Sequence, residues 1–161
     1  AAAAAAAASA FPSPAVVRAR PLDDFRRAGL SQRKAEYVRA VADAFDTTLT
    51  DDALHAMDDD DVVDVLTRIR GVGTWSANMA LIFAMARADR FPLGDLGVRK
   101  GIRALYYPAL GAKQLPSVQQ CAAVADKWRP YRSFGTLFMY RAANRLAVAA
   151  PPPAKRSRKR K

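Results

Sequence analysis

This sequence of 161 residues is poor in the residue types that build metal and redox centres, because it contains one cysteine, Cys121, and one histidine, His55. A single cysteine excludes a disulfide framework and a four-cysteine zinc or iron–sulfur centre, and it fits a reducing compartment. Cys121 lies within an apolar helical pattern, so we expect it to fill the core. His55 lies between two acidic stretches, and we expect it on a helix surface with no functional role.

Long apolar runs and strand patterns are missing too. No run of about 18 apolar residues occurs, which predicts that the chain does not span a membrane. No convincing alternation of apolar and polar residues occurs either, so we predict an all-α protein of about six helices with short connections. Ser31 and Asp95 stand where N-cap residues are expected, and the acidic run 58–61 suits the positive end of a helix dipole. The expected helices lie at residues 32–45, 62–69, 74–88, 96–106, 117–128 and 132–148.

Composition divides the chain into three segments. Residues 1–20 begin with an alanine-rich, low-complexity run that has no basic region before it, so we expect disorder rather than a secretory signal. Residues 21–148 carry the helical patterns and form the expected folded domain. Residues 149–161 are rich in proline and end with KRSRKRK, which holds six positive charges of a net +11. This cluster predicts attraction to nucleic acid and either a nuclear-localisation signal or a phosphate-binding arm, and we expect a nuclear protein.

Two glycines flank one valine at the junction between two predicted helices, as Gly71-Val72-Gly73. A hairpin of two helices needs glycine at a left-handed turn position, which is a purely structural explanation. The functional explanation is that a turn with few side chains lets backbone N–H groups at a helix start contact an anion. Arg68 and Arg70 add positive charge nearby, although such residues are also typical of a solvated helix end. The pattern therefore predicts either a plain turn or a grip on a DNA phosphate.

Three segments resemble one protein family over residues 22–143. LTRIRGVGTWSANMALIF is similar to the helix-hairpin-helix of the HhH-GPD DNA glycosylase superfamily. RADRFPLGDLGVRKG narrows the resemblance to the 3-methyladenine DNA glycosylase II branch, and VADKWRPYRSFGTLFMYRA resembles the closing helices of that branch. The resemblance implies the helix-hairpin-helix glycosylase fold. It also leads us to expect that the N-terminal lobe, with the apolar residue that fills the gap left by an extruded base, is missing.

The resemblance assigns roles to four side chains. It implies that Asp95 is the catalytic carboxylate, which stabilises positive charge developing on the sugar or orients the attacking water. By position alone Asp95 is also a helix cap. Trp75 takes the place of the Schiff-base lysine of relatives that also cut the backbone, which implies stacking on an extruded base. Tyr140 and Met79 match further positions of the base pocket. All three pocket residues are also plain core candidates, and the core is favoured for Met79.

The implied activity is that of a monofunctional DNA glycosylase, which hydrolyses the N-glycosidic bond of alkylated bases such as 3-methyladenine at the first step of base-excision repair. No lysine lies between Lys34 and Lys100, so no amine within the motif could cut the backbone. We expect duplex DNA with alkylated bases as partner, a monomer, and no cofactor beyond a structural monovalent cation held by the carbonyls of Thr67, Ile69 and Val72. The alternative is a catalytically impaired or truncated helix-hairpin-helix module that binds DNA.

Overall fold

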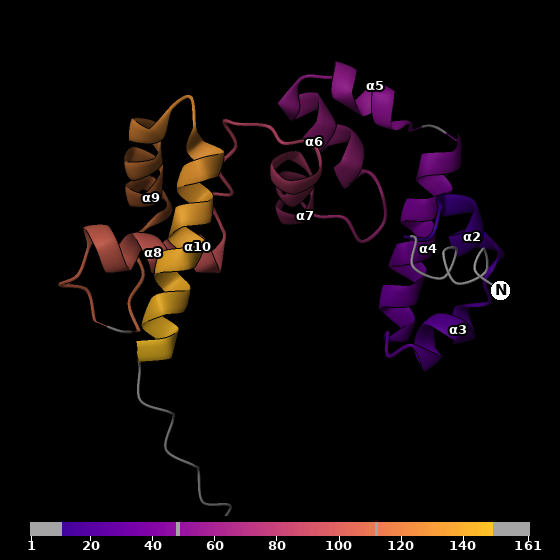
Figure 1. Ribbon diagram of the computed structural model, residues 1–161, viewed down its shortest axis with the longest axis horizontal. Coiled ribbons are helices and arrows are strands. Elements are labelled where there is room, and N and C mark those ends of the chain that lie inside the picture. The colour runs from indigo at the N-terminus through magenta and orange to yellow at the C-terminus, as the bar shows by residue number, and fades with distance from the viewer. Residues whose placement is uncertain (1–10, 48, 112, 150–161) are drawn as a thin grey trace, which may run out of the picture. The chain divides into compact units, whose positions relative to one another are not determined.

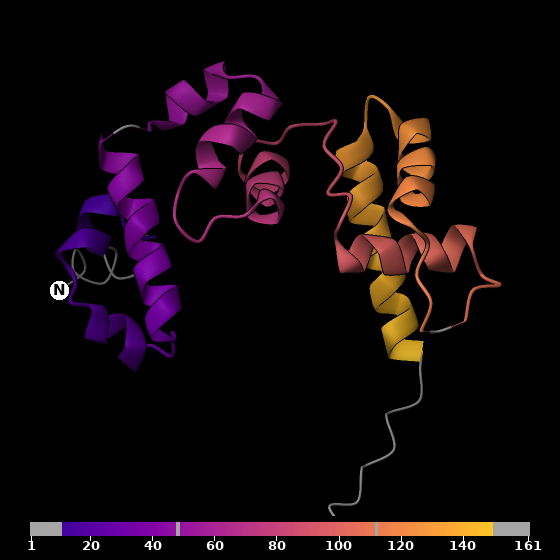
Figure 2. The same ribbon diagram turned by 180° about the vertical axis from the view of Figure 1, so that it is seen from behind.

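The computed structural model describes residues 11–47, 49–111 and 113–149, and every regular element in these ranges is a helix. The chain divides into two compact units, Ala1–Met85 and Ala86–Lys161. Figures 1 and 2 show the helices of each unit from opposite sides. No helix in the described ranges has the length and apolar character that crossing a bilayer requires.

The first unit contains six α-helices and one π-helical turn within the described residues. They are α2 (Pro14–Ala19), α3 (Leu22–Arg27), α4 (Gln32–Thr47), α5 (Asp51–Ala56), α6 (Asp59–Thr67), α7 (Thr74–Met79) and the π turn Ala80–Ala84 that prolongs α7. The short helices α2 and α3 both pack on α4, as both views show (Figures 1 and 2). α6 and α7 pack against each other on either side of the glycine turn, so together they form a helical hairpin.

Side-chain caps fix where several of these helices begin. Ser31 caps α4 as predicted, because its Oγ accepts a hydrogen bond from the backbone N–H of Lys34 at 3.4 Å. Ser13 and Thr50 cap α2 and α5 in the same way. Each cap supplies an acceptor for an N–H group that has no partner within its own helix. The acidic run 58–61 covers the N-cap and first turn of α6, where the helix dipole favours negative charge.

The core of the first unit lies between α4, α5, α6 and α7. Its buried apolar side chains are Leu49, Leu54, Val62, Leu66, Ile69, Ala77 and Leu81. α4 adds the partly buried side chains of Val41 and Phe45 to this cluster. Burial of each leucine-sized side chain contributes about 1.5–3 kcal/mol. The helical hairpin is therefore stabilised by apolar side chains that it shares with α4 and α5, and not by its turn alone.

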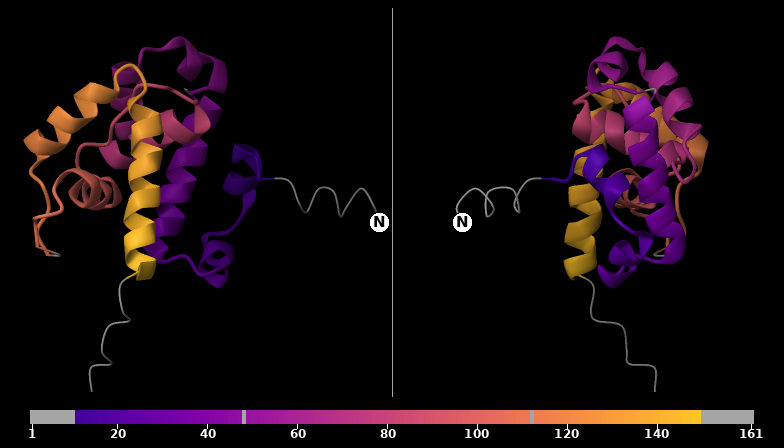
Figure 3. Two further views of the ribbon diagram at one scale, coloured as in Figure 1. Left: turned by 60° about the vertical axis from the view of Figure 1, so that its left-hand side comes forward. Right: turned by 90° about the vertical axis from the view of Figure 1, so that its right-hand side faces the viewer.

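The second unit is built on a close crossing of two helices. Its elements are α8 (Leu96–Tyr106), α9 (Val118–Ala125), a 3₁₀ turn (Asp126–Trp128) and α10 (Arg132–Ala149). α8 crosses the 18-residue α10 (Figures 1 and 2), and Figure 3 gives two further views of the ribbon. A Cβ atom at Gly101 of α8 would lie 2.2 Å from the carbonyl oxygen of Met139 on α10, so the crossing requires glycine. Cys121 is fully buried in the core beside them, as predicted.

All six predicted helices are present, but the described residues contain nine. The sequence patterns miss α2, α3 and α5, each of which is only six residues long. α2 lies within residues 1–20, where the sequence predicts disorder, and it packs on α4 instead. The alanine run before residue 11 and the basic cluster Lys155–Lys161 lie outside the described residues.

The helix predicted over residues 74–88 is wrong at its C-terminal end. After the π turn the chain leaves the helix at Met85, and Ala86 takes a positive φ of 52°. The residues that follow form a loop rather than a last helical turn. This loop leads directly to Asp95, so the early end of the helix affects how the predicted catalytic residue is held.

Candidate active site

Asp95 caps a helix as its position predicted, and its carboxylate has a second hydrogen-bond donor that capping does not supply. It is the N-cap of α8, and its Oδ1 accepts a hydrogen bond from the backbone N–H of Val98 at 2.8 Å. Its Oδ2 accepts a second bond, at 3.0 Å, from the hydroxyl of Tyr140 on α10. The residue is only 8% exposed. The carboxylate is therefore held through both oxygens in a largely desolvated place, where its charge acts more strongly than in water.

The ring of Tyr140 reaches Asp95 through the space that Gly97 leaves open. A Cβ atom at Gly97 would lie 2.9 Å from Cδ1 and Cε1 of the ring and 3.2 Å from Oδ1 of Asp95. Burial first, and then the hydrogen bond to Asp95, raise the pKa of the Tyr140 phenol well above its ordinary value. The phenol therefore remains protonated at neutral pH and donates to the carboxylate.

Arg132 at the start of α10 fastens the loop that precedes Asp95. Its Nε donates to Oδ1 of Asp89 at 2.7 Å, and its Nη2 donates to Oδ2 at 2.9 Å and to the Asp89 carbonyl at 2.9 Å. The backbone N–H of Arg132 also donates to Oδ1. The side-chain hydrogen bond from Arg132 lowers the pKa of Asp89, with burial opposing it and the charges of Arg132 and Arg129 adding to it. The two parallel hydrogen bonds fix the orientation of the loop, and Arg132 favours the ionised form of Asp89.

Ser133 holds the same loop from the next position of α10. Its hydroxyl donates to the carbonyl of Arg87 at 2.6 Å and accepts from the backbone N–H of Arg90 at 3.0 Å. Its own backbone N–H donates to the carbonyl of Ala88 at 2.9 Å. The sequence identified the segment around Arg132 and Ser133 only as part of a resemblance. Arg132 and Ser133 together form a clamp on the loop. Their partners lie more than 40 residues away, so sequence spacing alone does not reveal this contact.

The glycine turn between α6 and α7 matches the structural prediction closely. Gly71 has a φ of 93°, and a Cβ atom there would lie 2.2 Å from Cγ of Tyr37, whose ring packs under the turn. Val72 donates its backbone N–H to the carbonyl of Ile69 at 3.0 Å, which closes the turn. Gly73 is the N-cap of α7 and has nothing within 4 Å of a hypothetical Cβ atom. The turn thus offers open backbone at a helix start.

The two arginines beside the turn differ in their surroundings. Arg70 donates from Nη2 to Oε2 of Glu36 on α4 at 3.0 Å, and this ion pair offsets part of its charge. Arg68 is exposed at the C-cap of α6. Both remain at the surface of the first unit, where a polyanion can reach them.

Trp75 is more than half exposed, at 56%, so it is not a core residue. Met79, one turn further along α7, is half-buried. Both lie on the helix that starts at the glycine turn, in the first unit, whereas Asp95 and Tyr140 meet in the second. The pocket roles of Trp75, Met79 and Tyr140 stay predictions.

These features coincide with a match to a family model, the HhH-GPD superfamily base excision DNA repair protein, over residues 1–126. The chain belongs to this superfamily. The match includes the glycine turn and Asp95, and it ends before Arg132 and Tyr140. The HhH-GPD fold inferred from the three sequence segments is therefore correct.

Several curated relatives of this HhH-GPD chain are named DNA-3-methyladenine glycosylases, among them one from a bacterium and one from a yeast. A protein named putative DNA-3-methyladenine glycosylase YfjP from Bacillus subtilis is 30% identical over 135 residues, which cover 81% of this chain and 45% of the relative. DNA-3-methyladenine glycosylase 1 from Schizosaccharomyces pombe is 26% identical over 144 residues, which cover 88% of this chain and 61% of the relative. The chain therefore spans less than two thirds of the length of each of these relatives.

Solved structures support the same assignment. The S. pombe 3-methyladenine DNA glycosylase Mag1, in complex with abasic DNA, aligns with a TM-score of 0.73 and 26% identity over 81% of this chain and 63% of Mag1. A DNA-3-methyladenine glycosidase from Bacillus halodurans aligns with a TM-score of 0.73 and 28% identity over 86% of this chain and 63% of its own. The all-helical architecture of the HhH-GPD chain is thus that of known glycosylases.

The sequence predicts that three backbone carbonyls at the turn of this HhH-GPD chain hold a monovalent cation. Thr67, Ile69 and Val72 lie at the C-terminal end of α6 and in the turn, where backbone carbonyls lose their helical partners. The negative end of the helix dipole also favours a cation there. The carbonyl of Ile69 already accepts the N–H of Val72, and a carbonyl oxygen has a second lone pair. The predicted donor set is therefore chemically suited to a cation.

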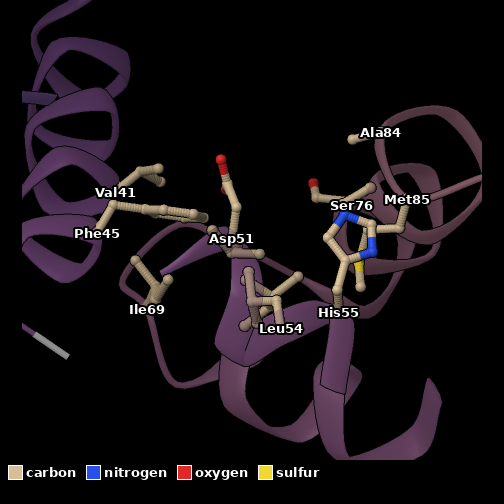
Figure 4. A pocket seen from close by; sticks show the side chains of 12 residues that line it. Val41, Phe45, Asp51, Leu54, His55, Ile69, Ser76, Ala84 and Met85 are labelled. Carbon is tan, nitrogen blue, oxygen red and sulfur yellow. The ribbon is translucent and has the colours of Figure 1, made fainter. Parts of the chain in front are cut away.

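A pocket of about 410 Å³ opens in the first unit, and Asp95 is not among its lining residues (Figure 4). Apolar side chains from α4, α5, the hairpin and the π turn form most of its lining. Asp51, His55 and Ser76 place polar groups at it, as Figure 4 shows. His55 is exposed on α5, in agreement with its expected surface position. Of the predicted site residues, Ile69 and Val72 contribute to the lining.

Proposed function

We propose that this protein is a monofunctional DNA glycosylase that hydrolyses the N-glycosidic bond of alkylated bases, such as 3-methyladenine, in duplex DNA. The observation that carries the proposal is the geometry of Asp95, a buried carboxylate whose two oxygens are held by an N–H and a hydroxyl donor. A helix needs no such second donor on its cap. The names of the relatives, DNA-3-methyladenine glycosylases, support the same chemistry.

The proposed reaction uses Asp95 as an electrostatic and water-orienting group. The bond between C1′ and the base nitrogen breaks, and its electron pair leaves with the base. A cationic base such as 3-methyladenine leaves as a neutral molecule, so a general acid is not needed. The carboxylate of Asp95 stabilises the positive charge that develops on the sugar. Water then adds its oxygen to C1′ and releases a proton to the solvent. The products are the free base and an abasic site in an intact backbone.

Trp75 supports the monofunctional assignment. Relatives that also cut the backbone are expected to carry a lysine at this position, and no lysine lies between Lys34 and Lys100 of this chain. The Trp75 side chain is more than half exposed on α7, so a base that has left the duplex can reach part of its surface. A cationic alkylated base stacks favourably on an electron-rich indole. Met79 and Tyr140 stay further predicted contacts of the base.

The glycine turn is the proposed contact with DNA phosphate. Gly71 provides the left-handed turn, Gly73 leaves open space beside the start of α7, and Arg68 and Arg70 add positive charge. This contact is independent of sequence, and it suits an enzyme that searches duplex DNA for damage. The carbonyls of Thr67, Ile69 and Val72 would hold the proposed monovalent cation below the turn, where it would strengthen the attraction for phosphate.

The remaining proposals concern the state and location of the protein. We propose that it acts as a monomer, since one chain supplies the turn and the carboxylate. We also propose a nuclear location, which the basic cluster KRSRKRK supports. A fluorescent fusion tests the location directly: the intact chain should concentrate in nuclei, and removal of residues 155–161 should abolish this.

An excision assay tests the central proposal. Purified protein in excess over methylated duplex DNA should release 3-methyladenine, which chromatography detects. Asp95→Asn should slow release by about 100- to 1,000-fold, because it removes the charge that stabilises the transition state. Asp52→Asn, a matched change at an exposed position of α5, should leave the rate unchanged.

Binding measured in parallel separates catalysis from recognition. Asp95→Asn should bind duplex DNA within about twofold of the parent chain, because phosphate contacts carry most of the affinity. Release by Asp95→Asn at the parent rate would contradict the proposed mechanism. Salt-dependent DNA binding without base release by the parent chain would instead favour the noncatalytic binding module.

A further inference from the structure

The carboxylate of Asp95 carries two hydrogen bonds of different origin. The bond from Val98 N–H to Oδ1 comes from the first turn of α8 and belongs to ordinary helix capping. The bond from the Tyr140 hydroxyl to Oδ2 comes from a different helix, 45 residues further along the chain. Capping needs only the first bond. The second bond therefore fixes the rotation of the carboxyl group about its last side-chain torsion, which the cap alone leaves loosely defined.

Two features show that this second bond is built into the packing. Gly97 leaves open the space for the Tyr140 ring directly beside Asp95, where any Cβ atom would come within 2.9 Å of the ring. The phenol is protonated at neutral pH even at the ordinary tyrosine pKa of about 10, so its hydroxyl has a proton to donate to the carboxylate.

We propose that Tyr140 is a positioning residue for Asp95: its hydroxyl, in the space left by Gly97, orients the carboxylate toward the sugar carbon at which the glycosidic bond breaks. This inference rests on the proposed catalytic role of Asp95. It assigns to Tyr140 a role that differs from stacking on the base, because the hydroxyl rather than the ring carries the effect. Misorientation of a reacting group by a fraction of an ångström is costly, since the charge must lie where the transition state develops.

The substitution Tyr140→Phe isolates the hydroxyl, because the ring and its packing remain. The single-turnover rate of base release should fall roughly 10- to 100-fold, which is the loss typical of removing a hydrogen bond to a charged group. The affinity for duplex DNA carrying the lesion should remain within about twofold of the parent value, since phosphate contacts are unchanged. Tyr131→Phe is the matched control, because it removes a hydroxyl from an exposed ring in the same unit, and its rate should equal the parent rate.

A second pair of variants tests the geometry without removing the hydroxyl. Gly97→Ala displaces the Tyr140 ring, while alanine favours the helix more than glycine does. It should lower the rate by a similar factor without lowering the melting temperature by more than a few degrees. Gly111→Ala, where a Cβ atom would come no closer than 3.6 Å to a flexible glutamine side chain, should leave the rate unchanged.

The outcomes separate this inference from the proposed function. A parent rate in folded Tyr140→Phe, with Asp95→Asn inactive, would overturn the positioning role and leave the glycosylase proposal intact. A parent rate at saturation combined with weaker lesion binding would limit Tyr140 to the predicted contact with the base and overturn the positioning role. If Tyr140→Phe does not fold, Gly97→Ala replaces it as the test. A parent rate of base release in folded Gly97→Ala would then overturn the positioning role. A parent chain without base release would contradict the glycosylase proposal itself.

Discussion

Arg132 and Asp89 lie 43 residues apart in the sequence and are joined by two parallel hydrogen bonds, which tie the start of α10 to the loop before Asp95. Arg132→Gln should therefore lower the free energy of unfolding by about 1.5–3 kcal/mol, the usual range for a hydrogen bond to a charged group. Arg129→Gln is the matched control. Arg129 also contacts Asp89, but it is more than half exposed and its bond is 3.4 Å long, so it should cost about 0.5 kcal/mol or less. Urea unfolding measures both, and equal losses would contradict the clamp.

The same pair gives the stability a dependence on pH. Arg132 lowers the pKa of Asp89 in the folded protein, so the unfolded chain takes up the proton at higher pH than the folded protein does. The stabilisation is therefore complete above the unfolded value of about 3.9 and is lost as pH falls through the folded pKa. As pH falls from about 6 to about 3, the free energy of unfolding should decrease more steeply for the parent chain than for Arg132→Gln. Parallel curves would show that the pair does not contribute.

The two glycines of the hairpin should respond differently to alanine. Gly71→Ala places a methyl group on a left-handed backbone and against the ring of Tyr37, so it should destabilise the protein by about 1–3 kcal/mol or more. Gly73→Ala meets open space and changes only an N-cap, so its cost should be about 1 kcal/mol. Thermal unfolding distinguishes them. Gly73→Ala should nevertheless weaken duplex binding, measured by fluorescence anisotropy, because its methyl group obstructs the approach of a phosphate. Unaltered affinity would remove the turn from the DNA interface.

The two tryptophans offer a similar contrast. Trp75→Ala should change the free energy of unfolding by about 1 kcal/mol or less, because the indole is largely exposed. Trp128→Ala should cost about 3–5 kcal/mol, since this ring packs edge-on against Phe91 at 5.8 Å and fits directly over Gly135. Release of 3-methyladenine should nonetheless fall in Trp75→Ala, in which the proposed stacking surface is lost. A strongly destabilised Trp75→Ala would instead indicate a structural role.

Duplex affinity should fall steeply as salt rises, because each phosphate contact releases a counterion. In a plot of log affinity against log salt concentration, Arg68→Gln should reduce the slope by about 1. Arg70→Gln should reduce it by less, because Glu36 already offsets part of the charge of Arg70. A flat dependence for the parent chain would argue against contact with phosphate by the turn and the basic cluster.

The sequence predicted the long helices because they depend on local signals, whereas the chemistry-bearing positions came from the family resemblance and stay predictions. Helical spacing of apolar residues located α4, α8 and α10, and cap residues located two of their starts, at Ser31 and Asp95. The six-residue helices α2, α3 and α5 carry too few turns for a pattern to emerge. Helices of that length owe their stability to packing rather than to propensity, so local reasoning does not detect them.

The parts of the site that were missed depend on long-range contacts. Residues 85–88 are good helix formers, and their propensity predicts helix. In the structure the segment that includes Ala88 is instead held as a loop by Ser133 and Arg132. The hydroxyl of Tyr140 likewise has its partner 45 residues away. Sequence reasoning identified Tyr140 by its ring, whereas its contact with Asp95 could be found only in three dimensions.

The crossing of α8 and α10 limits which substitutions in the second unit the proposed catalytic site tolerates. A methyl group at Gly101 would meet the backbone of Met139 rather than a side chain that could rotate away, so the helices themselves would have to separate. Asp95 caps the first of these helices, and Tyr140 follows Met139 on the second. Any separation would therefore lengthen the bond between the phenol and the carboxylate. Substitutions at Gly101, which has no functional group, should therefore inactivate the protein about as often as substitutions at Asp95.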